Sequence, residues 1–345
     1  MAFNTRASSG VSSRGTRLGW SYSLRYKERN QDANRRTHHM IYEKKTTQRK
    51  LTISIVGAGR MGGALALSLS AKGHRVNALF ARRLRNARRI ANLIGAEALP
   101  ASQIVSLPAS DLIIIATPDD AIAQVADKLA FAQTGQPGTR VALHTSGALS
   151  SAVLSPLADK EFKTGSLHPL VSVSDAVSGA AKLRGAYFCL EGARAALQVG
   201  RRIVSDLGGH AFSIEPRYKV LYHAAAVMAS GNMTALFDIA IEMLAACGLS
   251  RRHAREVLLP LVQSAVANLS LMEPSQALTG TFARGDVATV QKHLAAIREQ
   301  SLPDVVAAYS LLGQRSVSLA RRRRLTPAIA DQISILLKQS RKGRQ

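Results

Sequence analysis

Two side chains that could transfer a proton lie four residues apart in a segment that predicts a helix. Lys219 and His223 open the apolar stretch that follows Glu215 and Pro216. A spacing of four places both side chains on one face of an α-helix. Either could protonate a substrate oxygen. A solvated surface lysine and a buried, hydrogen-bonded histidine are the structural alternatives, and the sequence leaves the choice of proton donor open.

Further polar side chains follow predicted strands. Ser146 comes after the apolar run 141–144, and His168 follows the run 163–167. In open α/β sheets, ligands bind at the carboxyl ends of the strands. We therefore predict that Ser146 contacts a cofactor or substrate and that His168 contacts the substrate. For His168, a buried imidazole bonded to the backbone is an equally good interpretation.

A polar loop bounded by glycines interrupts the C-terminal helical pattern. Within it, Thr279 and Arg284 are candidate substrate contacts, because a guanidinium can pair with a carboxylate. Asp286 is better suited to cap the next helix. The histidines of the chain are scattered without the spacing of a metal site, so no metal is expected.

A glycine-rich turn carries the most specific local pattern. Gly57, Gly59 and Gly62 have G-x-G-x-x-G spacing directly after an apolar run and at the start of a predicted helix. Such a turn lets a pyrophosphate approach the backbone and meet the amides of the helix N-terminus. The predicted cofactor contacts in this turn are Gly57, Ala58, Gly59, Arg60, Met61 and Gly62.

The end of the next apolar run indicates which dinucleotide binds. An acidic residue there would favour NAD by binding the ribose 2′-hydroxyl, whereas this chain has Arg82 and Arg83. Both can pair with a 2′-phosphate, although Arg83 could equally lie at a solvated helix start. NADP(H) is thus preferred over NAD(H). Thr117 and Pro118, after a later run, are predicted to border the cofactor.

Short apolar runs that alternate with amphipathic segments predict the elements that position these residues. This pattern is typical of an α/β Rossmann fold, a doubly wound and mostly parallel sheet. The predicted strands are Thr52–Val56, Arg75–Phe80, Leu112–Thr117, Val141–His144, Lys163–Leu167, Ala186–Leu190 and Ala211–Ile214. After residue 215 the pattern becomes helical, in the segments 217–247, 250–270, 286–299, 302–320 and 326–339.

The domain prediction is therefore a basic, disordered leader over residues 1–50, a Rossmann domain over 51–215 and an all-α domain over 216–340. Of the net charge of +24, the leader carries +9 and residues 315–345 carry +8. Basic tails can bind polyanions without this being the protein's function. The two cysteines and the absence of an uninterrupted apolar run near 20 residues favour a soluble, cytoplasmic protein without membrane contact. An organellar transit peptide is the alternative for the leader.

Several motifs together resemble a bacterial family that pairs a Rossmann-like domain with a C-terminal helical domain long without an assigned function. The motifs are Gly57–Gly63, Thr117–Asp120, His144–Gly147, Ser166–Pro169, Tyr222–Ala226 and Ala277–Asp286. The family is related to 6-phosphogluconate dehydrogenase and ketopantoate reductases. Two departures stand out: Gly231 separates Ser230 from Asn232, and Thr281 stands where a proline is usual.

The resemblance implies an NADP(H)-dependent reductase of a small keto acid, ketopantoate being one candidate, that forms a homodimer. It places Lys219 where ketopantoate reductases have a lysine, with His223 replacing an asparagine, and it implies that Asn232 binds substrate. A catalytically silent NADP(H) sensor that engages a partner is the alternative function. Specific nucleic-acid binding is not expected, since no recognition helix or stacking platform is visible.

Overall fold

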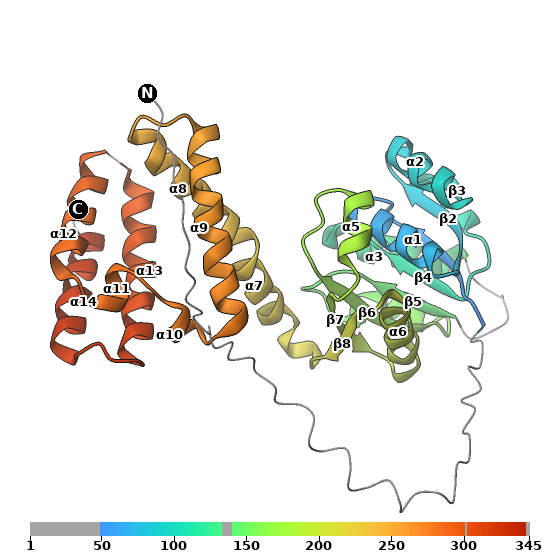
Figure 1. Ribbon diagram of the computed structural model, residues 1–345. Coiled ribbons are helices and arrows are strands. Elements are labelled where there is room, and N and C mark those ends of the chain that lie inside the picture. The colour runs from blue at the N-terminus through green and yellow to red at the C-terminus, as the bar shows by residue number, and fades with distance from the viewer. Residues whose placement is uncertain (1–48, 133–139, 301, 343–345) are drawn as a thin grey trace, which may run out of the picture. The chain divides into compact units, whose positions relative to one another are not determined.

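The computed structural model describes residues 49–132, 140–300 and 302–342 (Figure 1). The predicted disordered leader, apart from its last two residues, lies outside the described residues. Within these ranges, an eight-stranded sheet occupies the N-terminal part of the sequence and helices follow it.

The sheet has the predicted doubly wound arrangement. Its strands lie in the order β3-β2-β1-β4-β5-β6-β7-β8 and are parallel except for the antiparallel β6–β7 pair. The α/β prediction is confirmed. The strand bounds are β1 (Thr52–Val56), β2 (Arg75–Ala81), β3 (Glu97–Pro100), β4 (Leu112–Ile115), β5 (Val141–His144), β6 (Lys163–Leu170), β7 (Tyr187–Gly192) and β8 (His210–Ser213).

Among the strands that the structure describes, β3 is the one that the sequence pattern does not predict. It is four residues long, lies at the sheet edge beside β2 and contains Glu97 and Pro100. A proline and an acidic residue are tolerated at an edge, where one side of the strand needs no partner. Because of these residues, the segment lacks the continuous apolar run that is typical of a central strand.

Helices cover both faces of the sheet, and each face has its own apolar core. One core includes residues of α1 (Arg60–Ala71), α2 (Leu84–Ile94) and α6 (Arg194–Leu207). The other includes residues of α3 (Asp119–Ala132) and α4 (Ser155–Ala158). Burial on both faces explains why strands such as β4, Leu-Ile-Ile-Ile, are continuously apolar. The remaining helices of this part are α5 (Ala176–Lys182), η1 (Ala101–Ser106) and η2 (Ser151–Leu154).

All described elements after residue 215 are helical. They are η3 (Pro216–Tyr218), α7 (Lys219–Ala229), α8 (Gly231–Ala246), α9 (Arg251–Leu271), α10 (Pro274–Ala277), α11 (Thr281–Arg284), α12 (Val287–Glu299), α13 (Pro303–Arg321) and α14 (Pro327–Lys342). A third apolar core, with Leu294, Ile333 and Leu337 among its residues, joins α12, α13 and α14. The helix predicted over 217–247 is broken at Ser230, whose backbone has φ −123° and ψ −70°.

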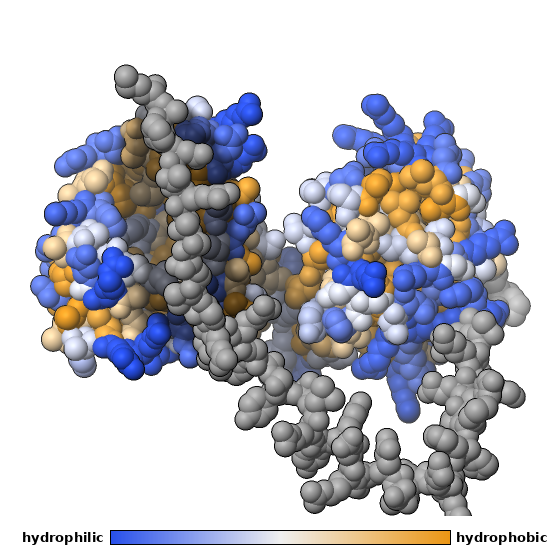
Figure 2. Space-filling model, viewed as in Figure 1, coloured by the Kyte–Doolittle hydropathy of each residue, from blue (hydrophilic) through white to orange (hydrophobic). Residues whose placement is uncertain are grey.

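The segment from α7 to α8 is apolar and yet exposed. Over Pro216–Ala246 an 18-residue window has a mean hydropathy of 1.4, and only 6% of it is buried. By length and composition alone, this segment could cross a membrane, although polar residues such as Asn232, Asp238 and Glu242 interrupt its apolar sequence. Exposed apolar side chains continue on α9, including Leu261 (66% exposed) and Leu269 (53% exposed). Part of this apolar surface is visible around α8 and α9 in Figure 2.

Two arginines of the run 321–324, at the end of α13, contact other parts of the protein. Arg321 forms an ion pair with Asp331, and Arg323 donates a hydrogen bond to the carbonyl of Gln276. These contacts hold the turn between α13 and α14 against α10.

Alanine substitution at two glycines near the loop between β1 and α1 should affect the stability of the protein differently. A methyl group on Gly62 would lie 2.1 Å from the carbonyl oxygen of Gly57, whereas one on Gly59 would meet nothing within 4 Å. We expect Gly62→Ala to cost about 2 kcal/mol, the usual range for overpacking, and to lower Tm by roughly 5 °C. Gly59→Ala should leave Tm within about 1 °C. Thermal unfolding followed by circular dichroism makes the comparison, and equal Tm values for the two variants would contradict it.

Candidate functional site

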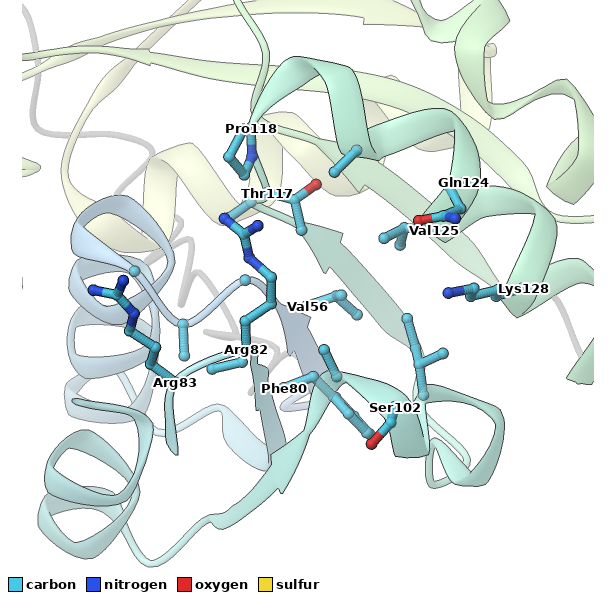
Figure 3. Close-up of a pocket in the computed structure, with 18 of the residues that line it drawn as sticks. Val56, Phe80, Arg82, Arg83, Ser102, Thr117, Pro118, Gln124, Val125 and Lys128 are labelled. Atoms are coloured by element: carbon cyan, nitrogen blue, oxygen red, sulfur yellow. The ribbon is translucent and has the colours of Figure 1, made fainter. Parts of the chain in front are cut away.

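A cavity of about 950 Å³ lies at the carboxyl ends of β1, β2 and β4 (Figure 3). Its lining includes the predicted cofactor contacts Gly57, Ala58, Gly59, Arg82, Arg83, Thr117 and Pro118. Further lining residues come from η1, α2 and α3: Ala101, Ser102, Ile104, Asn86, Ala121, Gln124, Val125 and Lys128. The structure therefore gathers most of the predicted cofactor residues around one cavity.

The glycine loop forms a cradle with space for a phosphate. The amides of Gly57 and Ala58 donate to the carbonyl of Phe80, which fixes the loop on β2. Gly57 has φ +100°, and a methyl group there would lie 2.6 Å from the Ala116 carbonyl, so only glycine fits. The amides at the start of α1 have no partner within the helix. Together with open space at Gly59, they can receive an anion.

One buried polar atom in the cavity wall has no partner among the described residues. The Thr117 Oγ1 atom is buried and makes no hydrogen bond. Buried hydroxyls are normally hydrogen-bonded, and Thr117 is one of the residues that line the cavity. A ribose hydroxyl or a phosphate oxygen would satisfy it. The unpaired hydroxyl and the glycine cradle thus fit a bound dinucleotide.

The cavity wall is positively charged. Arg82, Arg83 and Lys128 line it, and no acidic side chain appears among the described residues that do so. In Figure 3, the Arg82 side chain extends toward Thr117 and Pro118, and Arg83 lies farther from them. Such a wall attracts a polyanion and offers guanidinium groups for bidentate phosphate contacts. Arg60 instead lines a smaller pocket with Arg89 and Asp175, and Met61 packs against the sheet core.

A second polar cluster joins α7 to the loop after β5 and to the middle of β6. Lys219 is only 1% exposed, and its Nζ donates to Ser166 Oγ at 2.6 Å and to the Ser146 carbonyl at 3.1 Å. Burial is the main cause that lowers the pKa of the Lys219 ammonium. The structure therefore places the predicted lysine in the cluster, but encloses it.

The Ser146 hydroxyl is fully engaged in hydrogen bonds. Its Oγ donates to Asp119 Oδ2 at 2.8 Å and accepts from the amides of Ala148 and Leu149. A hydroxyl has one proton and two lone pairs, so this oxygen has no capacity left for a ligand. In this arrangement Ser146 connects β5 to the start of α3 and, through its carbonyl, to Lys219. That role differs from the direct contact that we predicted.

Two histidines and a tyrosine complete the cluster. His168 Nδ1 lies 2.7 Å from the Tyr222 hydroxyl, and the rings of His168 and His223 meet edge to face at 5.8 Å. The backbone of Gly147 lies between these histidines: a methyl group there would be 2.5 Å from His223 Cδ2 and 2.9 Å from His168 Nε2. Gly147 thus lets both imidazoles approach the same point at the end of β5.

Burial and the Lys219 charge keep two of the imidazoles neutral. Burial first, and then the nearby Lys219 ammonium, lower the pKa of both His144 and His168 to about 4. Burial likewise raises the pKa of Tyr222. At neutral pH the imidazoles of His144 and His168 are therefore neutral, and the phenol of Tyr222 is protonated.

The structure brings together four of the predicted site residues: Ser146, His168, Lys219 and His223. The three candidate substrate residues farther along the chain do not join them through any contact that the described residues show. Asn232 is exposed on α8 and its amide donates to Met228 Sδ. Thr279 is exposed, and Arg284 is exposed at the end of α11.

Sequence reasoning missed several members of both sites. Tyr222, Ser166 and Asp119 belong to motifs quoted above, but none of them was singled out as a site residue. Gln124 and Lys128 follow Pro118 on α3 at a spacing of four. The sequence shows this spacing. It does not show that residues of η1 and α3 line the same cavity.

Comparisons with known proteins agree with the fold. A family model described as a Rossmann-like domain matches residues 39–169, and a domain of unknown function, DUF2520, matches residues 186–316. The chain thus carries a Rossmann-like domain followed by a DUF2520 domain. A sequence search of the curated proteins gave no significant match.

Solved structures with the same fold include three whose chains are matched almost completely. A proposed NADP oxidoreductase from Bacteroides fragilis has a TM-score of 0.60 and 19% identity, over 85% of this chain and 98% of that one. A protein from Thermotoga maritima has a TM-score of 0.56 and 23% identity, over 84% and 98%. A reductive aminase from Aspergillus terreus, in complex with NADPH and ethyl levulinate, has a TM-score of 0.55 and 18% identity, over 83% and 99%.

The neutral state of His144 predicts a pH dependence of stability. The folded protein holds the pKa of His144 near 4, against an ordinary 6.5. The resulting stability is present above pH 6.5 and is lost as the pH falls through 4, about 3 kcal/mol in all. Urea unfolding gives the free energy of unfolding at pH 7 and at pH 4. Between these two pH values, the free energy of unfolding of the wild type should fall by about 3 kcal/mol more than that of His144→Asn, a variant that keeps an acceptor for the Ser146 amide. Parallel losses in the two proteins would exclude His144 as the cause.

Proposed function

We propose that this protein is an NADP(H)-dependent oxidoreductase that reduces the C=O or C=N bond of a small acid. The observation that carries the proposal is the turn between β4 and α3. Thr117 lines the basic cavity, and Asp119, two residues later, accepts the hydrogen bond of Ser146 in the histidine cluster. A dinucleotide site and a set of proton-transferring side chains are therefore joined by three residues of chain.

The cofactor would be held by the glycine loop, Thr117 and the arginines after β2, and when bound it supplies a hydride to the substrate carbon. The positive cavity wall supports NADP(H) over NAD(H), because a 2′-phosphate adds two negative charges near Arg82 and Arg83. The likeness to a reductive aminase that holds NADPH is consistent with this assignment.

Among the cluster residues, His223 is the better candidate for the proton donor. It is half-buried on α7, one turn beyond Lys219, whereas Lys219 is enclosed and already donates two hydrogen bonds. A general acid must reach the substrate atom that it protonates. We assign to Lys219 the role of fixing α7 on the strand ends and keeping His168 neutral. His168, held by Tyr222, would donate a hydrogen bond to the substrate.

The proposed substrate class follows from the need for a proton donor during the reduction. A keto acid such as ketopantoate, or the corresponding imino acid, needs a proton at its oxygen or nitrogen as the hydride arrives. Its carboxylate would need a cation, and Arg284 with Thr279 and Asn232 are our candidates from the helical part.

We also propose that the protein is a homodimer through the apolar faces of α7, α8 and α9. Exposed large apolar side chains gather there: Val220, Leu221, Met228, Met233, Leu236, Val257, Leu261, Val266, Leu269 and Leu271. Apolar patches of this extent on a soluble protein mark interaction surfaces. A second copy offers the same apolar surface, as a twofold interface requires.

The first test is NADPH oxidation, followed at 340 nm with ketopantoate and a panel of keto and imino acids. We expect turnover, and we expect His223→Ala to reduce it by about 100-fold, in the range for a lost general acid. Lys219→Met should reduce it at least about tenfold, because the cluster loses its charge and its anchor. The matched control is His253→Ala, an exposed histidine on α9.

Two results would contradict the reductase proposal. Binding of NADPH without turnover on any substrate of the panel would favour a sensor. A loss of less than about tenfold when Lys219 and His223 are both changed to alanine would remove them from the catalytic machinery.

The dimer prediction is tested by light scattering after size exclusion. The wild type should elute as a dimer, and Leu261→Glu combined with Leu221→Glu should yield monomers, because a buried charge without a partner opposes association. Leu93→Glu on α2, a position that is 62% exposed, is the control and should leave the dimer intact. A monomeric wild type at concentrations of about 50 μM would refute the dimer, since an interface of this size would be occupied there.

A further inference from the structure

Among the residues that the structure describes, one carboxylate and one ammonium are buried, and both lie next to the same serine. Glu191 is 5% exposed and Lys219 is 1% exposed. Lys219 Nζ donates to Ser166 Oγ at 2.6 Å, and Ser166 lies directly opposite Glu191 in the antiparallel β6–β7 pair. Directly opposite residues share a sheet face, with Cβ atoms about 4.5–5.5 Å apart. The carboxylate is therefore a close neighbour of the ammonium.

Two hydrogen bonds hold the Glu191 carboxylate in place. Its Oε2 accepts from the Ser151 amide at 2.7 Å, and its Oε1 accepts from the Ser151 hydroxyl at 2.6 Å. Both oxygens thus accept, as those of an ionised carboxylate do. Burial of such a charge is costly unless it is hydrogen-bonded and has an opposite charge nearby. Ser151 supplies the hydrogen bonds, and Lys219 is the buried cation beside them.

Glu191 forms one end of a row of buried polar side chains on a single face of the sheet. His144, Ser166 and Glu191 are paired in register across β5, β6 and β7. The start of η2 joins the two ends of the row: His144 Nε2 donates to the Ser150 carbonyl at 3.2 Å, and Glu191 accepts from Ser151. A sheet face that is buried under helices is normally aliphatic. Packing of the sheet therefore does not explain a carboxylate at this position.

Other titratable groups surround Lys219, but they are less suited to balance its charge. They are His144 on β5, His168 on β6, Cys189 on β7, Asp119 at the start of α3, and Tyr222 and His223 on α7. Burial lowers the pKa values of the two strand imidazoles and raises those of the thiol and the phenol, so these four groups are neutral at neutral pH. An imidazole carries no negative charge in either of these forms. Asp119 is exposed, so the solvent screens its charge.

We propose that Glu191 is a positioning residue that balances the buried charge of Lys219 and so preserves the ammonium that anchors α7. This inference rests on the proposed function, in which Lys219 in turn positions His223. Burial lowers the pKa of Lys219, and the Glu191 carboxylate acts in the opposite direction. Without the carboxylate, Lys219 would lose its proton at a lower pH. Its hydrogen bonds would then lose the strength that the charge gives them.

The test follows the titration of Lys219 by NMR, in full-length protein with lysine labelled with ¹³C at the ε-carbon. The variant Lys219→Met identifies the resonance, and the other lysines are the internal reference. We expect Glu191→Gln to lower the pKa of Lys219 by about 1 pH unit, the usual effect of removing a nearby opposite charge. A glutamine oxygen still accepts from the Ser151 amide, so this variant removes the charge and keeps a hydrogen bond.

Three further variants separate the charge of Glu191 from its surroundings. Ser151→Ala keeps the carboxylate and should leave the pKa of Lys219 unchanged. Asp119→Asn removes the exposed carboxylate and should lower this pKa by less than Glu191→Gln does. Glu97→Gln, on the exposed edge strand β3, repeats the same chemical change far from any role in the proposal and should have no effect.

Activity provides a second measurement. If Lys219 must be charged during turnover, the alkaline limb of the pH profile of kcat/KM should move to lower pH in Glu191→Gln, by as much as the pKa of Lys219 does. Should Glu191→Gln be too unstable for these measurements, thermal unfolding replaces them. The double variant with Glu191→Gln and Lys219→Met lacks both charges, so its Tm should exceed that of Glu191→Gln alone, which buries an unpaired ammonium.

Four results would overturn the inference. They are an unchanged pKa of Lys219 in Glu191→Gln, an equal fall in Ser151→Ala, an equal or larger fall in Asp119→Asn, and a double variant that is no more stable than Glu191→Gln. None of these measurements needs turnover, so they are independent of the test of the proposed function. A protein without reductase activity in which Lys219 titrates as expected would refute that function and confirm the charge pair.

Discussion

The arrangement of the candidate site depends on one buried charge. An ammonium removed from water is costly unless several acceptors surround it, and Lys219 meets this requirement with Ser166 Oγ and the Ser146 carbonyl. Ser146 follows the end of β5, and Ser166 lies within the adjacent parallel strand β6, opposite the last residue of β5, so the lysine ties α7 to the carboxyl end of β5. Because His223 lies one turn farther along α7, the same contact fixes the position of the second imidazole. Removing the ammonium would release α7 and leave buried acceptors unpaired.

The same charge determines the protonation of its surroundings. An ammonium in a poorly solvated region opposes further positive charge, and this adds to the burial that lowers the pKa values of His144 and His168. Asp119 partly balances the charge through Ser146, and it begins the helix whose next turns line the cofactor cavity. The polar cluster around Lys219 and the basic cavity are therefore not independent. A change in the turn from Thr117 to Asp119 affects both.

Much of this arrangement could be predicted because parallel α/β sheets bring strand ends to one edge. That rule places Ser146 correctly, just after β5, and helix periodicity adds Lys219 and His223. The sequence pattern predicts that His168 follows its strand, but β6 continues to Leu170 and His168 lies within it. The rule could not show that the Ser146 hydroxyl is saturated, since its partners lie 27 residues away at Asp119 and on the adjacent backbone. Nor could it show that Gln124 and Lys128 line the cavity, since this depends on the packing of η1 near α3. Short edge elements and saturated hydrogen bonds depend on packing, and residue spacing does not encode them.

The hydrogen bonds of the cluster also fix which nitrogen of each neutral imidazole carries its proton. His144 Nδ1 accepts from the Ser146 amide, so its proton is on Nε2, where the Ser150 carbonyl accepts it. For His168, the raised pKa of Tyr222 keeps the phenol protonated. An imidazole nitrogen is a much better acceptor than the Cys189 thiol beside it, so the phenol donates to His168 Nδ1. The remaining proton of His168 is then on Nε2, the atom that lies against Gly147 on the side of His223. The cluster consequently presents a donor, not an acceptor, toward the point where the two histidines meet. This is the polarity that a developing alkoxide or amine nitrogen requires.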